Sequence, residues 1–307
     1  MITSIFSKSK PINFIIVFFI TALAFWIAHY NSHPNPLGVD ALLKLIFSFG
    51  LGYVSLLILN FIVSKNRLTK NNNYEILLYS LFLLAMSSTT TDKNILFANF
   101  FILLGLRRVL SIRTQIRLNK KLFDAAFWIT IAALFYFWSI LFFLVILISL
   151  AFYTDNKLNH WLIPFSGLLT VFILAVCFSV INYDDYFRVF SSLPTTGYDF
   201  SRYNSSPFIA AITLFLSFGI WSSIFYGISI KQKKKAFRPS YKTILVAFII
   251  ALALVIIVPK TNGSEFLFMF APLSIIVTNY IQTIKDKWFK EIFLLILLVA
   301  PFIILML

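Results

Sequence analysis

Ten apolar runs, separated by short polar segments, are the feature that most constrains the fold of this chain. Runs of this length suit helices that cross the hydrocarbon core of a bilayer, which is about 30 Å thick. Hydrophobic residues make up 60% of the sequence and charged residues only 12%, which excludes a water-soluble enzyme or DNA-binding protein. We therefore predict an all-α, polytopic transmembrane helical bundle. The runs cover residues 12–29, 41–63, 75–88, 94–106, 122–153, 160–182, 207–230, 243–259, 264–284 and 291–307.

The run at 122–153 is too long for one ordinary span. As a single helix it would be about 48 Å long, well beyond the hydrocarbon core. It is either a steeply tilted rod or two short helices that turn near Tyr136, Phe137 and Trp138. Two crossings leave each helix short, so the pair can also be a re-entrant hairpin among its neighbours.

The placement of lysine and arginine chooses between these alternatives, because cytoplasmic loops carry the excess of both residues. If 122–153 crosses twice, every basic cluster lies on one side of the membrane. If it crosses once, the cluster at 231–242 lies opposite the cluster at 107–121. We therefore predict about eleven spans, with the N-terminus inside and the C-terminus outside. The clusters lie at residues 8–10, 65–70, 107–121, 231–242 and 285–290.

The same topology explains the formal net charge of +15, so no nucleic-acid partner is needed. Only a few basic residues, Lys44 and Lys93 among them, fall on the outer side. All loops are short, which predicts a single integral membrane domain over 1–307 without a separate soluble domain. An active site in such a chain must be built from span ends and loops.

The longest outer loop, residues 183–206, combines carboxylates, arginines and aromatic rings. Aromatic faces with carboxylates can bind sugars, and arginine can hold a phosphate through two hydrogen bonds. Asp185 is a candidate catalytic residue here. The alternative is an amphipathic segment that lies on the outer leaflet. The candidates for substrate binding are Arg188, Arg202 and Tyr198.

The first outer loop, residues 29–40, ends at Asp40. Asp40 is a candidate catalytic acid or base at the membrane surface, and the alternative is a helix cap at the start of the second span. Glu265 begins a late span on the same side and is a further candidate for substrate binding. His29 and His33 lie in this loop, but two histidines are weak evidence for a metal, and we predict no metal site.

Motifs for cofactor chemistry are missing from the sequence, which carries no nucleotide-binding glycine loop and no zinc-protease helix. We therefore predict no cofactor. The span interiors hold almost no charged residues, which argues against an ion-coupled carrier and leaves a facilitator or flippase open.

Two stretches resemble a known family. The hairpin at 125–153 and the stretch at 264–288, with Pro272 early in a span, resemble helices of GT-C type membrane glycosyltransferases. The resemblance implies a polyprenyl-phosphate-linked sugar bound at the outer face, with Asp40 in the position of a catalytic carboxylate. The whole chain also resembles an uncharacterised family of bacterial inner-membrane proteins about 300 residues long.

Three functions follow as hypotheses. The first is a membrane subunit in cell-envelope assembly or export, with protein partners in an envelope complex. The second is a GT-C-like glycosyltransferase that takes its sugar from a polyprenyl-phosphate lipid carrier. The third is a lipid or small-molecule transporter or flippase. Each places the chain in the bacterial cytoplasmic membrane, in contact with membrane lipid.

Overall fold

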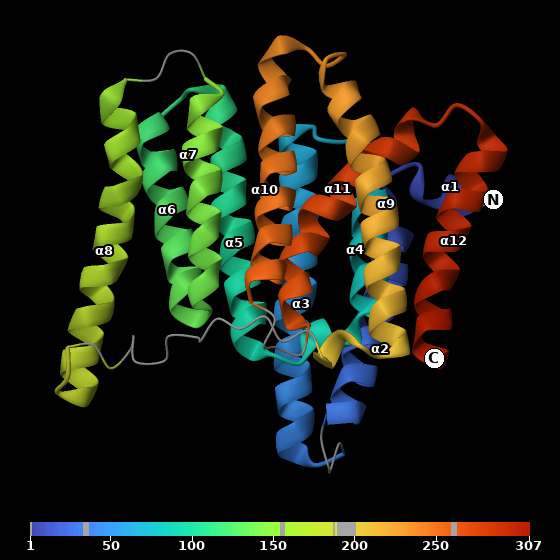
Figure 1. Cartoon of the computed structure of the whole chain (residues 1–307), viewed down its shortest axis with the longest axis horizontal. Coiled ribbons are helices and arrows are strands. Elements are labelled where there is room, and N and C mark those ends of the chain that lie inside the picture. The colour runs from blue at the N-terminus through green and yellow to red at the C-terminus, as the bar shows by residue number, and fades with distance from the viewer. Residues whose placement is uncertain (1, 33–36, 154–156, 187, 189–200, 259–262) are drawn as a thin grey trace.

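The computed structural model describes residues 2–32, 37–153, 157–186, 188, 201–258 and 263–307. These residues form an all-α bundle of twelve α-helices joined by short turns and 3-10 helices (Figure 1). The helices are α1 (Ile2–Phe6), α2 (Pro11–Ser32), α3 (Val39–Asn66), α4 (Tyr74–Ala85), α5 (Lys93–Ser111), α6 (Leu118–Phe135), α7 (Phe143–Ala151), α8 (Leu158–Tyr183), α9 (Ser206–Ile230), α10 (Arg238–Ile257), α11 (Leu267–Thr283) and α12 (Lys287–Met306).

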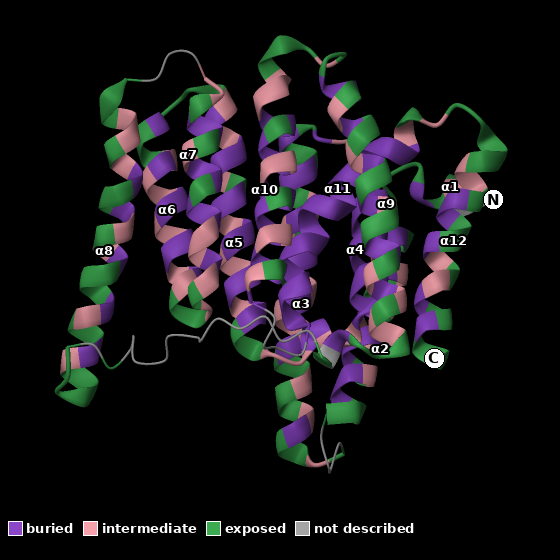
Figure 2. Cartoon of the chain, viewed as in Figure 1, coloured by how far each residue is buried: buried purple, intermediate pink, exposed green. Residues whose placement is uncertain are grey.

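Eight of these helices are long and apolar enough to cross a membrane: α2, α3, α5 and α8 to α12. Two shorter apolar segments, Tyr74–Ala85 and Phe137–Ala151, lie among them. The outer helices α8, α9 and α12 expose many large apolar side chains, as expected for surfaces that face lipid tails (Figure 2). The prediction of a multi-pass helical membrane protein is confirmed by helix length and hydropathy.

The run at 122–153 turns where the sequence predicts. Helix α6 ends at Phe135, and the extended backbone of Tyr136 (φ −144°, ψ 102°) breaks the helical path. A 3-10 helix, η3 (Phe137–Phe142), then leads into α7. Helices α6 and α7 lie beside each other in Figure 1, so the run forms a hairpin and not a tilted rod.

The basic clusters meet at one end of the bundle, which we call the basic end. The guanidinium of Arg113 lies 4.1 Å from the ring centre of Phe237. This contact joins the α5–α6 connection to the α9–α10 connection. Tyr241 donates a hydrogen bond to the main-chain oxygen of Arg67 (3.3 Å). The main-chain N–H of Lys70 donates to Gln282 at the end of α11 (3.1 Å). The connections α9–α10 and α11–α12 lie at this upper end in Figure 1, opposite the C-terminus at what we call the distal end.

Helices α4 and α11 form the centre of the bundle. All twelve residues of α4 are buried, and so is α11 from Leu267 to Ile281 (Figure 2). The sequence predicts a span at 75–88, but α4 ends at Ala85 and the chain continues as the 3-10 helix η1 (Ser87–Thr90). Three consecutive threonine side chains, Thr89, Thr90 and Thr91, donate hydrogen bonds to main-chain oxygens three residues earlier in place of a longer helix. The central helix is therefore shorter than predicted.

Helix α8 lies at one edge of the bundle and packs mainly against α6 (Figure 1). The contact depends on Gly167, because a Cβ atom there would lie 2.8 Å from the main-chain oxygen of Phe123 and 3.0 Å from Cβ of Ala126. Small residues at such contacts let membrane helices approach closely.

Candidate functional site

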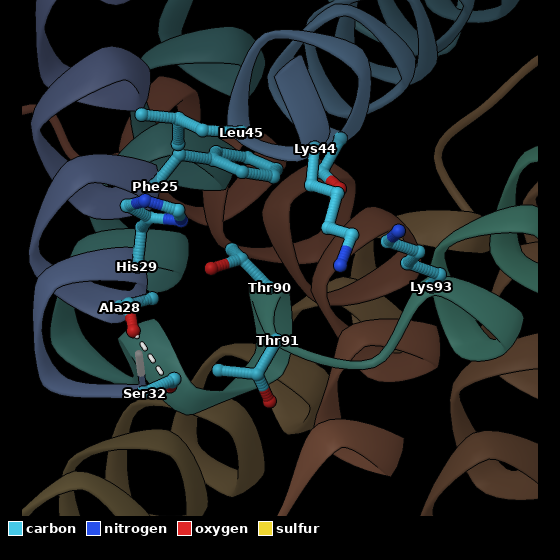
Figure 3. Close-up of a pocket in the computed structure, with 10 residues that line it drawn as sticks. Phe25, Ala28, His29, Ser32, Lys44, Leu45, Thr90, Thr91 and Lys93 are labelled. Carbon is cyan, nitrogen blue, oxygen red and sulfur yellow. Dashed lines mark hydrogen bonds between the residues drawn. The ribbon is translucent and has the colours of Figure 1, made fainter. Parts of the chain in front are cut away.

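A polar pocket lies at the distal end, where α2 ends, α3 begins and η1 leads into α5 (Figure 3). Its volume is about 230 Å³. The side chains come from four segments that are far apart in the sequence, so only the folded chain assembles them. The lining residues are Phe25, Ala28, His29, Ser32, Lys44, Leu45, Ser48, Thr90, Thr91 and Lys93.

Two lysines give this pocket its charge. Lys44 from the second turn of α3 and Lys93 from the start of α5 bring their ammonium groups to the same rim (Figure 3). Among the described residues the single ion pair joins Arg108 to Asp124 (3.1 Å), so neither lysine is neutralised by a carboxylate there. Two neighbouring cations that form no ion pair among the described residues favour an anion between them.

Three hydroxyl groups of the pocket are already used as donors. Thr90 and Thr91 donate to the main-chain oxygens of Ser87 and Ser88 (both 2.8 Å), and Ser32 donates to Ala28 (2.7 Å). Their oxygens can still accept hydrogen bonds. An anion in the pocket would therefore be held by the lysine ammonium groups and the imidazole of the buried His29, with the threonines shaping the wall.

An apolar groove between α2 and α3 adjoins this pocket. Its volume is about 430 Å³, and it shares Phe25 and Leu45 with the polar pocket. The side chains of Phe19, Trp26 and Ile46 in its wall are largely exposed. A hydrocarbon chain of the bilayer has access to such a surface, and it meets the basic pocket at one end. The other lining residues are Ala22, Leu23 and Phe49.

A buried carboxyl group lies on the other side of η1. Glu265 is in the 3-10 helix η7 (Ser264–Phe266) and is 0% exposed. Tyr136 donates a long hydrogen bond (3.5 Å) to Oε1 of Glu265. The Oε2 atom has no hydrogen-bond partner among the described residues. Ser264 donates to the main-chain oxygen of Ser88 (3.2 Å), which fastens η7 to η1 beside the pocket.

The predicted helix cap at Asp40 is wrong. Gly38 is the N-cap of α3, and Asp40 is an exposed residue in the first turn. Its carboxylate still suits the positive end of the helix dipole. Asp40 lies one turn before Lys44, so the two side chains share a face of α3 near the mouth of the pocket. Asp92 is the side chain that caps a helix at this end: it accepts from the main-chain N–H groups of Asn94 (2.8 Å) and Ile95 (3.3 Å) in α5.

The candidates in the longest outer loop lie elsewhere. Asp185 is exposed just after α8, where its main-chain oxygen accepts a hydrogen bond from Ser179 (2.6 Å). The exposed Arg188 lies 5.3 Å from the ring centre of Tyr183. Helix α8 is separated from α3 by other helices in Figure 1, so Asp185 and Asp40 are not brought together. Tyr198 and the side chain of Arg202 lie outside the described residues, as does His33.

The pocket lysines were missed as site residues because each has an ordinary local role: Lys44 near a span end, and Lys93 after a threonine-rich turn. The available signal was that both lie on the side of the membrane where the topology predicts few basic residues. Within the described residues, no three histidine, cysteine, aspartate or glutamate side chains converge on a metal position.

No curated protein and no solved structure matches this chain. A family match extends over residues 1–306, almost the full length, in accord with the predicted resemblance to uncharacterised membrane proteins. That match names no activity, so the resemblance to glycosyltransferases stays a proposal. The chain belongs to DUF6427, a family of unknown function.

Proposed function

We propose that this protein binds a lipid with an anionic, phosphate-type headgroup at its distal end. The headgroup lies between Lys44 and Lys93, and a hydrocarbon chain lies in the apolar groove along α2 and α3. The observation that carries the proposal is that the basic pocket and the apolar groove adjoin, with Phe25 and Leu45 in the walls of both. A soluble anion would need only the basic pocket, whereas a lipid uses both parts.

The proposed orientation places the basic end in the cytoplasm of a bacterium and the lipid site in the outer leaflet of the cytoplasmic membrane. Eleven segments then cross the membrane, if α4, α6 and the α7 hairpin arm are counted with the eight long spans. The contacts that join the basic clusters at one end support this arrangement, because positive residues are retained on the cytoplasmic side. The N-terminus is then inside and the C-terminus outside.

Within this proposal, transfer of a group from a polyprenyl-phosphate-linked sugar is the chemistry that suits the site best. Asp40 lies one helical turn from Lys44, at the depth where a headgroup would meet water, and is the candidate acid or base. Glu265 is enclosed behind η1, with a tyrosine as its hydrogen-bond donor, so it can support the shape of the site without meeting solvent.

Native mass spectrometry of the chain purified in mild detergent tests the proposal through the lipid that stays bound. Lys44→Gln and Lys93→Gln remove one cation each and leave a shorter, neutral polar side chain. Each is expected to weaken retention of an anionic lipid by about ten-fold or more, as expected for loss of a charge-assisted hydrogen bond. Lys157→Gln at the basic end is the matched control and should leave retention unchanged. Equal retention in all three variants would contradict the proposal.

The purified protein also allows the other hypotheses to be tested, each by its own measurement. A protein that co-purifies in stoichiometric amount would favour the role as a subunit of an envelope assembly or export complex. Release of the bound lipid into the opposite leaflet of a vesicle would favour a flippase. Loss of activity in Asp40→Asn with unchanged lipid retention would favour the enzyme.

A further inference from the structure

A second hollow lies at the basic end, between the α1–α2 turn, the end of α3 and the start of α4. Its volume is about 440 Å³, within the range of about 300–1,000 Å³ for ligand pockets. Most of its lining is polar and includes Ser9, Asn60, Arg67, Lys70, Asn73 and Glu75. It is far from the lipid site, at the opposite end of the bundle.

Glu75 is the acidic residue in this lining, and it is 1% exposed. Its Oε2 atom has no hydrogen-bond partner among the described residues, and it forms no ion pair with them. The Nδ2 atom of the buried Asn73 is likewise without a partner there. A buried carboxyl oxygen without a partner is costly to the fold, so a ligand that brings an N–H donor to Oε2 would gain what the protein does not supply there.

The opposite charge comes from the connection between α3 and α4. Arg67 and Lys70 have exposed side chains, and neither has a carboxylate partner among the described residues. Arg67 ends α3 in the left-handed conformation (φ 52°), which turns the chain sharply beside the hollow. The wall thus presents a buried carboxyl group on one side and two cations on the other.

The walls are fixed by contacts from three other segments. The main-chain N–H of Asn73 donates to Phe6 of α1 (3.1 Å). The main chain of Arg67 is held by Tyr241, and that of Lys70 by Gln282, as described above. A preformed site loses little entropy when it takes up a ligand.

We propose that this hollow binds a compact zwitterion, with its primary ammonium group at Glu75 and its phosphate at Arg67 and Lys70. The same chemistry has two sources: the headgroup of phosphatidylethanolamine in the adjacent leaflet, and free phosphoethanolamine. A primary ammonium offers three N–H donors to the carboxyl group of Glu75, whereas the trimethylammonium of choline offers none. The free Nδ2 of Asn73 is itself a donor and suits a phosphate oxygen. The site therefore selects ethanolamine over choline.

Two measurements on the full chain separate the sources. In the first, thermal unfolding in detergent is followed with added O-phosphoethanolamine, and phosphocholine is the matched control. In the second, unfolding is compared in nanodiscs of phosphatidylcholine with and without phosphatidylethanolamine. A higher unfolding temperature in the nanodisc measurement alone identifies a lipid headgroup, and a rise in both identifies the headgroup chemistry in either form. A rise with O-phosphoethanolamine alone identifies a free solute. No rise in either, or an equal rise with the choline compounds, overturns the proposal.

Variants tie the effect to this hollow. Glu75→Gln keeps the shape of the side chain and is expected to weaken binding by about ten- to a hundred-fold. Arg67→Gln should weaken it as well and provides a second test if Glu75→Gln does not fold. Lys65→Gln removes an exposed positive charge from the same end, outside the lining, and should leave binding unchanged. Unchanged binding in Arg67→Gln and Glu75→Gln, or an equal loss in Lys65→Gln, would contradict the assignment.

Discussion

Substitution of Gly167 by alanine is expected to loosen α8 from the bundle. The added Cβ would lie 2.8 Å from the main-chain oxygen of Phe123 and 3.2 Å from the main-chain nitrogen of Phe127. Carbon atoms normally keep a separation of about 3.5 Å or more. Both neighbours are backbone atoms of α6, which cannot rotate out of the way, so the two helices must separate along their contact.

The magnitude is the sum of two opposing effects. Alanine is a better helix residue than glycine by about 1 kcal/mol. Overpacking of a well-packed contact costs about 1–3 kcal/mol, and a clash with rigid backbone lies toward the upper end. The net expectation is a loss of up to about 2 kcal/mol for Gly167→Ala. In Gly227→Ala the added Cβ meets no atom within 4 Å, so this matched variant should be neutral or slightly stabilising.

The assay is equilibrium unfolding in detergent, together with amide hydrogen exchange of α8. Gly167→Ala should unfold more readily than the unmodified protein and should exchange faster in α8, while Gly227→Ala should do neither. Equal stability of the two alanine variants would refute the reasoning, because it would mean that the α6–α8 contact yields without cost.

Two further predictions concern the ends of the helices. Asp92→Ala removes the cap of α5 and should lower the free energy of unfolding by about 0.5–2 kcal/mol. Asp92→Asn can still accept both hydrogen bonds, so it should stay close to the unmodified protein in the same thermal unfolding measurement. Glu291→Ala removes the carboxylate that accepts hydrogen bonds from the main-chain N–H and the hydroxyl of Thr3, so amide hydrogen exchange should become faster in α1. Lys287→Ala on the same helix is the control and should leave α1 protected. If α1 stays protected in Glu291→Ala, this contact does not hold α1.

The parts of the fold that depend on local pattern could be predicted from the sequence. The apolar runs give the helices, and the alternation of basic loops predicts the turn at Tyr136 without knowledge of any contact. The depth of a helix in the bundle could not be predicted in this way. Tyr74 and Tyr241 lie at helix ends, where a ring suits the membrane interface, yet neighbouring segments bury both.

The candidate sites depend still more on tertiary packing. Lys44 and Lys93 are far apart in the sequence and meet because α3 packs against α5. Glu75 is the first residue of the apolar run at 75–88, where a carboxylate would be expected to meet water, but the folded chain leaves it 1% exposed. Asp40 and Asp185 both read as outer carboxylates, and the bundle holds them on separate helices.

The complete burial of α4 also constrains how the chain enters the membrane. Twelve residues of helix extend about 18 Å, while the hydrocarbon core is about 30 Å thick. Such a segment, with a glutamate in its first turn, cannot be a stable span on its own in lipid. It needs α2, α3 and α11 around it, and α11 is synthesised almost two hundred residues later. We therefore expect α4 to stay at the insertion machinery or in a shallow position until the last helices are made. A chain truncated before α11 would then lack the helix that packs against α4 at the centre of the bundle.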